Sequence, residues 1–190
     1  VKASQDPDSY YATSILKQEG FQRSSCTKCN LNFWAQDKTR TICGDSSCIG
    51  VFSVANNKLC KQQLSYLDVR NTFQTHFQKR NYQSIKRYPV VARWNPTVDF
   101  TIASIAAFQP FVVTGEIDPP AKRLVIPQFC LRFGDIDNIG ITGSHCIGFV
   151  MVGQHQFVPK DEWNQEEAFQ DIYDYLTKVI GLDKQELILH

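Results

Sequence analysis

The sequence predicts an α+β fold, in which a small metal-binding module precedes a mostly antiparallel sheet flanked by helices. Three observations predict this class. The N-terminal third contains four cysteines in two closely spaced pairs. Short apolar runs rich in Val, Ile and Phe, broken by Pro and Gly, follow between residues 88 and 157. Segments with helical spacing of apolar residues lie on both sides of this block.

The composition is that of a globular protein without a strong overall charge. The 190 residues are 43% hydrophobic, and 20 Lys+Arg against 19 Asp+Glu leave a net charge of +1. This balance argues against a basic coat for nucleic acid or membrane, so any RNA site has to be local. No apolar run approaches the roughly 18 residues of a membrane span. We therefore expect an intracellular, cytoplasmic protein with no membrane partner; because the chain begins at Val1, a removed leader and an organellar location stay open.

The first expected element is a short helix over residues 8–19, where apolar residues recur at helical spacing and Gly20 provides the stop. It leads into a C-x2-C-x13-C-x4-C motif made by Cys26, Cys29, Cys43 and Cys48. Two tight turns of this kind can present four thiolates to one Zn²⁺, at about 2.3 Å each. The motif therefore predicts a zinc ribbon, which together with the helix occupies residues 1–58.

We expect this Zn²⁺ to be structural, because the motif contains no His or carboxylate and leaves no open position for catalysis. The total of seven cysteines is odd, which argues against a fully paired disulfide framework. Two disulfides, or four unrelated buried thiols, remain the alternative. Cys60, Cys130 and Cys146 are then expected to be small buried side chains.

The second expected domain covers residues 59–190 and begins with a helix. Ser65 and Asp68 resemble a capping box at its start. One side of this helix carries Leu67, Phe73 and Phe77. Strand candidates follow at residues 90–94, 100–108, 111–114, 124–133 and 146–152. Helical spacing returns over residues 161–180, with Gly181 as the stop and an apolar stripe formed by Phe169, Ile172, Leu176 and Ile180.

A local basic cluster is the candidate contact for RNA. It consists of Lys79, Arg80, Lys86, Arg87 and Arg93. Tyr82, Tyr88 and Trp94 are interleaved with these residues, which suits phosphate contact combined with base stacking. Charged residues at helix ends and strand starts are also often simply solvated, so that interpretation stays open.

Several motifs together carry a resemblance to a known family. They are the cysteine motif with its Cys-Gly-Asp, Tyr-Pro-Val-Val-Ala-Arg-Trp at 88–94, Thr-Ile-Ala-Ser-Ile at 101–105, Cys-Leu-Arg at 130–132 and Asp-Ile-Asp-Asn-Ile-Gly at 135–140. Over nearly its whole length the chain resembles the N-terminal part of an archaeal-type alanyl-tRNA synthetase. The resemblance implies a class II synthetase fold, in which an antiparallel sheet flanked by helices holds ATP and alanine and passes alanine to tRNA.

The resemblance also implies the position of the nucleotide site. Residues 100–110 resemble the first class II motif, and residues 124–157 resemble the second, a strand, a loop and a returning strand. Arg132 matches the arginine that contacts the α-phosphate of ATP, and it is the expected catalytic residue if the site is active. Its guanidinium offers a bidentate, permanently charged contact. Phe149 and Met151 match the nucleotide-binding side of the returning strand; a surface arginine and a core methionine are the plainer alternatives.

The chain also departs from the family pattern. Ser144 replaces an arginine, Val150 replaces a glutamate, and Gln154 replaces one of two paired histidines, while His155 keeps the other. The third class II motif, whose arginine holds the γ-phosphate, lies beyond this region in the family. We therefore expect that this chain does not alanylate tRNA by itself.

Three functions are compatible with these observations. The first is a non-catalytic alanyl-tRNA-synthetase-like protein that binds tRNA, other RNA or protein in a larger ribonucleoprotein assembly. The second is one part of an active alanine–tRNA ligase, completed by another polypeptide that carries the third motif and covers a free sheet edge. The third is a zinc-ribbon interaction module. ATP and Mg²⁺ are expected only with an active site, whereas structural Zn²⁺ is expected in each case.

Overall fold

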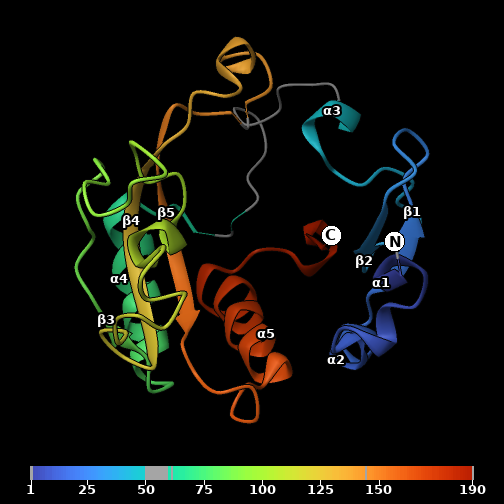
Figure 1. Cartoon of the computed structure of the whole chain (residues 1–190). Coiled ribbons are helices and arrows are strands. Elements are labelled where there is room, and N and C mark those ends of the chain that lie inside the picture. The colour runs from blue at the N-terminus through green and yellow to red at the C-terminus, as the bar shows by residue number, and fades with distance from the viewer. Residues whose placement is uncertain (1, 50–59, 61, 144, 190) are drawn as a thin grey trace. The chain divides into compact units, whose positions relative to one another are not determined.

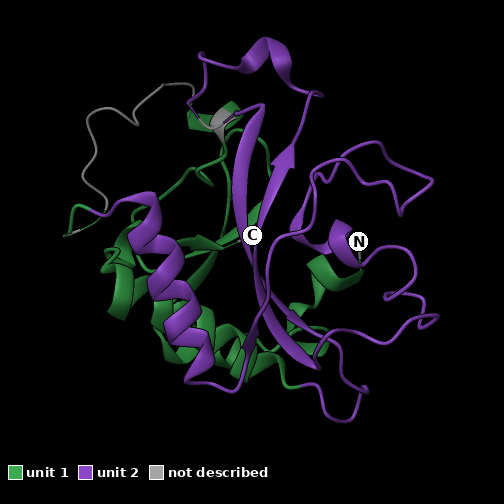
Figure 2. Cartoon of the chain, turned by 90° about the vertical axis from the view of Figure 1, so that its left-hand side faces the viewer, with its two compact units in different colours: residues 1–63, 164–190 green, residues 64–163 purple. Residues whose placement is uncertain are grey.

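The computed structural model describes residues 2–49, 60, 62–143 and 145–189, and Figure 1 shows the elements in chain order. The chain divides into two compact units (Figure 2). Unit 1 comprises Val1–Gln63 and Asn164–His190, and unit 2 comprises Leu64–Trp163. The expected boundary between residues 58 and 59 lies outside the described residues and stays a prediction. Helices combined with antiparallel strand pairs confirm the α+β class.

Three short helices begin unit 1: α1 (Lys2–Gln5), η1 (Pro7–Ser9) and α2 (Thr13–Gln18). The expected continuous helix over residues 8–19 is therefore wrong in extent. The carboxylate of Asp8 accepts hydrogen bonds from the Thr13 hydroxyl and, at 2.7 Å, from the Lys17 ammonium, and such side-chain bonds compete with helical ones. The expected end is confirmed, because Gly20 follows the last turn with a φ of +87°.

Three strands form the sheet of unit 1: β1 (Gln22–Ser25), β2 (Asn32–Ala35) and β6 (Ile188–Leu189). The strand β2 pairs antiparallel with both others. Side chains alternate along β2, so Phe33 and Ala35 are buried while Asn32 and Trp34 are half-buried on the other face. The single-turn helix α3 (Ser46–Ile49) completes the N-terminal segment.

The C-terminal segment of unit 1 contains α5 (Gln165–Asp174), the π-helical turn η4 (Tyr175–Ile180) and η5 (Lys184–Glu186). Asn164 caps α5 by accepting the Glu167 N–H at 3.1 Å, so the helix begins later than expected, and Gly181 ends it as predicted. Of the expected apolar stripe only Ile180 is buried, and the buried face of the helix instead carries Asp171, Tyr173 and Tyr175.

Unit 2 begins with α4 (Tyr66–Gln78), whose capping box is confirmed. Ser65 Oγ accepts the Asp68 N–H at 3.2 Å, and the Asp68 carboxylate accepts the Ser65 N–H at 2.9 Å. Phe73 and Phe77 are buried as expected, but Leu67 is 57% exposed. At 100° per residue Leu67 lies about 80° around the helix from Phe77, which takes it off the buried face.

The sheet of unit 2 has the order β3–β4–β5. Its strands are β3 (Gln83–Ser84), β4 (Arg123–Leu131) and β5 (Gly148–Gln156). The last two pair antiparallel, with Arg123 opposite Gln156 and Leu131 opposite Gly148. The expected strand, loop and returning strand are therefore confirmed. The short parallel strand β3 was not expected from the sequence, since two polar residues carry no strand pattern.

Three other strand predictions in unit 2 are wrong. Residues 90–94 and 100–108 contribute an isolated bridge between Val91 and Phe100, followed by the 3-10 helix η2 (Ser104–Phe108). Residues 111–114 form turns. Short apolar runs do not distinguish a strand from a buried helical turn, and Ala107 and Phe108 pack from η2 onto Leu124 and Ile126 of the sheet. No helix in the described part of the chain has the length and apolarity needed to cross a membrane.

Candidate functional site

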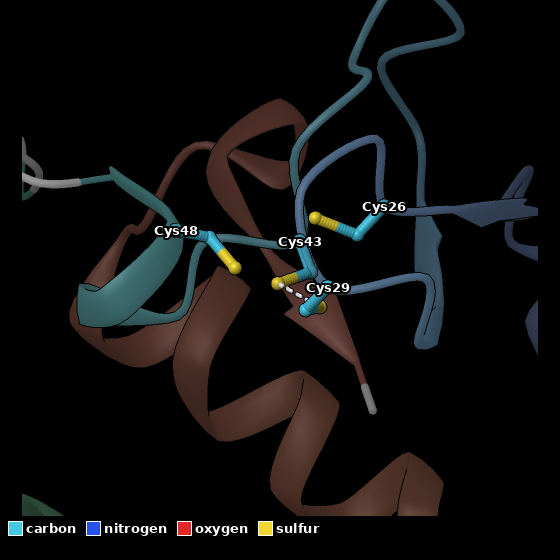
Figure 3. A group of neighbouring side chains, drawn as sticks. All are labelled: Cys26, Cys29, Cys43 and Cys48. Carbon is cyan, nitrogen blue, oxygen red and sulfur yellow. Dashed lines mark hydrogen bonds between the residues drawn. The ribbon is translucent and has the colours of Figure 1, made fainter.

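The four cysteines of the motif converge in unit 1 (Figure 3). Their sulfur atoms all lie within 4.8 Å of one another, and Cys29 Sγ is 3.8 Å from Cys43 Sγ. Four thiolates around one tetrahedral Zn²⁺ at about 2.3 Å are separated by about 3.8 Å, so the donor set fits a metal. The seven cysteines, all of which are described, are free, which is against the disulfide alternative.

Local hydrogen bonds hold each half of the motif in place. In the first turn the N–H of Asn30, at a φ of +59°, donates to the Cys26 carbonyl at 2.9 Å. In the second, the Asp45 carbonyl accepts the Cys48 N–H at 2.9 Å as α3 begins. Phe33 of β2 is fully buried and belongs to the same core cluster as Cys26, Cys43 and Cys48. The cluster is thus built from short-range turns around one aromatic side chain.

The thiols of this cluster have very different proton affinities. Backbone N–H groups of Cys29 and Cys43 lower the pKa of Cys26 to about 6, whereas burial raises the pKa of Cys48 to about 12 and also raises that of Cys43. Metal binding requires thiolates and releases their protons, so a cation among these sulfurs offsets the cost of burying the charge.

A second candidate site lies in unit 2 where the β4–β5 loop begins. A cavity of about 440 Å³ is lined by Arg132, Asp135, Ile139, His145, Cys146 and Phe149. Arg132 directly follows β4, and its Nε donates to the Ile102 carbonyl at 2.9 Å. Its guanidinium carbon lies 5.0 Å from the centre of the Phe149 ring, which is a cation–π contact. The Nη1 and Nη2 atoms have no hydrogen-bond partner among the described residues and are available to a ligand.

The structure brings together only part of the expected nucleotide site. Arg132 and Phe149 share the cavity, but Met151 does not line it; its sulfur accepts the Ser104 N–H at 3.3 Å. Cys146 was expected to be buried and is exposed in the cavity, because it belongs to the loop before β5. His145 and Cys146 were not predicted as site residues, and no spacing signal marks them. Ser144 lies outside the described residues.

His155 has a structural environment within unit 2. Its Nε2 lies 3.0 Å from Ser104 Oγ, and its ring contacts Phe108 edge-on and Phe157 face to face. Burial lowers the pKa of His155 to about 4, so the ring is neutral at physiological pH. Gly153 makes this possible, because a Cβ at that position would collide with Ser104 and with the imidazole.

The basic cluster is largely exposed, but two of its aromatic neighbours are engaged within the fold. Exposed side chains are Lys79, Lys86, Arg87 and Arg93. Arg80 is half-buried, with Nη1 3.3 Å from the His76 carbonyl. Tyr82 is 3% exposed and its hydroxyl accepts a bond from Gln154 at 2.8 Å, while Trp94 donates to the Ala106 carbonyl at 3.4 Å. The expectation of base stacking by Tyr82 is therefore wrong, and RNA contact by the cluster stays a prediction.

Comparison with known proteins adds independent information. Residues 68–190 match the family described as tRNA synthetases class II (A). An alanine–tRNA ligase of Methanocella arvoryzae is 40% identical over 185 residues, which is 96% of this chain and 21% of the relative. Alanine–tRNA ligases of Nitrosopumilus maritimus and Archaeoglobus fulgidus are 36% and 37% identical, over 97% and 95% of this chain and 21% and 20% of the relatives. The chain thus spans about a fifth of the length of these curated relatives.

Proposed function

The chain belongs to the class II tRNA synthetases, and on that premise we propose that it forms the ATP-binding part of an alanine–tRNA ligase. The arrangement of Arg132 is the observation that carries this proposal. The Ile102 carbonyl holds its Nε, the Phe149 ring covers one face, and the two terminal nitrogens remain available beside a cavity. A guanidinium held in this way is suited to a bidentate contact with a phosphate.

The chemistry that this arrangement supports is adenylate formation. The carboxylate of alanine attacks the α-phosphorus of ATP, a new P–O bond forms, and the bond to pyrophosphate breaks. Negative charge builds up on the α-phosphate oxygens, and the fixed guanidinium of Arg132 stabilises it without having to reorient. Class II synthetases bind ATP together with Mg²⁺, which neutralises charge on the phosphates when bound.

We also propose a structural Zn²⁺ at Cys26, Cys29, Cys43 and Cys48, which makes the N-terminal segment a zinc ribbon. The sulfur separations and the absence of disulfides among the described cysteines support this assignment. A closed set of four thiolates leaves no position for substrate, so the metal stabilises the fold.

A partner for the chain is proposed on two grounds. The family implies interaction with tRNA, and exposed Lys79, Lys86, Arg87 and Arg93 offer phosphate contacts in unit 2, with Arg80 partly engaged. In addition, β5 has no strand on its second edge in the described part of the sheet. A nine-residue strand with no strand partner on one edge, among the described residues, supports pairing with further polypeptide, whether in the same chain or in another one.

The second candidate is a non-catalytic synthetase-like protein that is kept for binding RNA or protein. The observation in its favour is Val150, which lies opposite Phe129 in the hairpin and presents an apolar side chain where the family has glutamate. Losing an acceptor in direct contact with a ligand costs about 1–3 kcal/mol.

Calorimetric titration with a non-hydrolysable alanyl-adenylate analogue separates the two candidates. We expect the zinc-loaded chain to bind, and Arg132→Ala to weaken binding about tenfold or more, because it removes a charged hydrogen-bond donor. Arg87→Ala is the matched control, since Arg87 is exposed and does not line the cavity. A folded wild-type chain that does not bind the analogue would contradict the ATP-binding proposal and favour the non-catalytic candidate.

A further inference from the structure

A second cavity lies wholly within unit 1 and shares no lining residue with the cysteine cluster or with the Arg132 cavity. Its volume of about 530 Å³ is within the range of about 300–1,000 Å³ that is usual for small-ligand sites. The larger apolar side chains of its lining are Tyr11, Trp34, Phe169, Leu16, Leu31 and Leu189. Three aromatic rings in one lining offer flat surfaces on which a planar ligand can stack.

The indole of Trp34 leaves a donor unused at this cavity. Trp34 is half-buried, and its Nε1–H has no hydrogen-bond partner within the described ranges. Trp94 in unit 2 is also half-buried, but its Nε1–H donates to the Ala106 carbonyl at 3.4 Å. The indole N–H of Trp34 is therefore available as a donor to a ligand in this cavity, whereas that of Trp94 is already engaged.

Two further donors line the same cavity. Gln165 uses Oε1 to accept the Ala12 N–H at 2.8 Å, and its Nε2 amide has no partner among the residues that the structure describes. Arg23 donates from one terminal nitrogen to the Ser4 carbonyl and retains its other donors. It is the single charged residue of the described lining, which contains no carboxylate. The cavity therefore suits a ligand that is planar, rich in acceptors and negatively charged.

We infer that this cavity binds a nucleotide of unpaired RNA, with the base on the aromatic lining and a phosphate at Arg23. Unpaired bases stack on aromatic side chains and expose acceptors along their edges, and the phosphate supplies the charge. A peptide backbone brings one N–H donor for each carbonyl acceptor. It would therefore match a lining that offers mainly donors less well than a base and a phosphate would. The inference rests on the RNA partner of the proposed function, but it is independent of the ATP site at Arg132.

The tryptophan indole signals test the inference directly. The ¹⁵N-labelled, zinc-loaded chain is titrated with hexa-adenylate RNA and, separately, with AMP, and the Trp34 signal is assigned with Trp34→Phe. We expect RNA to shift the Trp34 signal saturably, with tighter binding for RNA than for AMP. A Trp34 signal that RNA leaves unchanged would overturn the inference. Equal affinity for RNA and AMP would also overturn it, because it would indicate a site for free nucleotide. An apolar hexapeptide is titrated in parallel, and a shift of the Trp34 signal by the peptide but not by RNA would likewise contradict the inference.

Two adjacent tyrosines provide a matched pair of variants. Tyr11 and Tyr10 are 54% and 55% exposed, but only Tyr11 lines the cavity, so neither substitution opens the core. We expect Tyr11→Ala to weaken hexa-adenylate binding at least about fivefold and Tyr10→Ala to leave it unchanged, because one base stack is lost. Equal effects of the two substitutions would overturn the inference. Titrating the Tyr10→Ala and Tyr11→Ala chains with the alanyl-adenylate analogue as well keeps this result separate from a failure of the ATP site.

Discussion

The cysteine cluster of unit 1 and the Arg132 cavity of unit 2 are assembled over different distances along the chain. The hydrogen bonds within each cysteine turn join residues no more than five positions apart, and the bond from the Thr27 N–H to the Thr41 carbonyl, which joins the two turns, spans 14 positions. Arg132 is instead held by Ile102, which precedes it by 30 residues, and by Phe149 on the returning strand. Residue spacing in the sequence is enough to identify a site of the first kind, whereas a site of the second kind depends on how strands and loops pack.

Removing the metal should produce the largest effect and should be confined to unit 1. We expect Cys26→Ser, or a strong chelator, to abolish Zn²⁺ binding and to unfold the β1–β2 hairpin, because metal binding contributes about 10 kcal/mol or more to small zinc modules. Zinc content by mass spectrometry and denaturant unfolding followed by near-ultraviolet circular dichroism measure the two effects.

Cys60→Ser is the control for this prediction, because Cys60 is a half-buried thiol outside the motif. It should leave the zinc content and the free energy of unfolding nearly unchanged. A chain that keeps its fold in chelator and contains no metal would contradict the zinc assignment and would favour four packed thiols.

The core of unit 2 should respond to a different substitution. Phe108 is 1% exposed and packs on Leu124 and Ile126, so Phe108→Ala should destabilise unit 2 by about 3–5 kcal/mol through lost burial and a cavity. The zinc content should not change. Ile141→Ala is the control, since Ile141 is 67% exposed and its loss should cost about 0.5 kcal/mol or less. Loss of zinc in Phe108→Ala would show that the two regions are not energetically separate.

The sequence predicted the local parts of the fold better than the non-local ones. The capping box of Ser65 and Asp68 and the stop at Gly181 were correct, because each depends on a few neighbouring residues. The strands β4 and β5 were also correct. Residues 100–108 were wrong because their apolar pattern fits a strand, while their packing against the sheet selects the 3-10 helix η2.

The same distinction applies to the sites. Spacing alone identified the four cysteines that the structure brings together. Resemblance identified Arg132 and Phe149, but not that Met151 would lie outside their cavity or that Cys146 would be exposed in it. The Ile102 carbonyl, which positions Arg132, is a backbone group, and no residue pattern could have marked it.

The free energy of unfolding of the two regions should also depend differently on pH. The smallest predicted effect is that of His155 in unit 2. The pKa of His155 is about 4 in the folded chain and about 6.5 when unfolded, so the unfolded state binds more protons between these values. The stability that the neutral ring contributes is fully present above about pH 6.5 and is lost as the pH falls toward 4.

We expect His155→Gln, whose amide can still reach Ser104, to flatten the pH dependence of unfolding of unit 2 between pH 6.5 and 4.5. Denaturant unfolding across this range, with zinc content followed in parallel, separates this effect from protonation of the cysteines. An unchanged slope in His155→Gln at constant zinc content would mean that the acid sensitivity arises elsewhere, which would place it with the thiolates of unit 1.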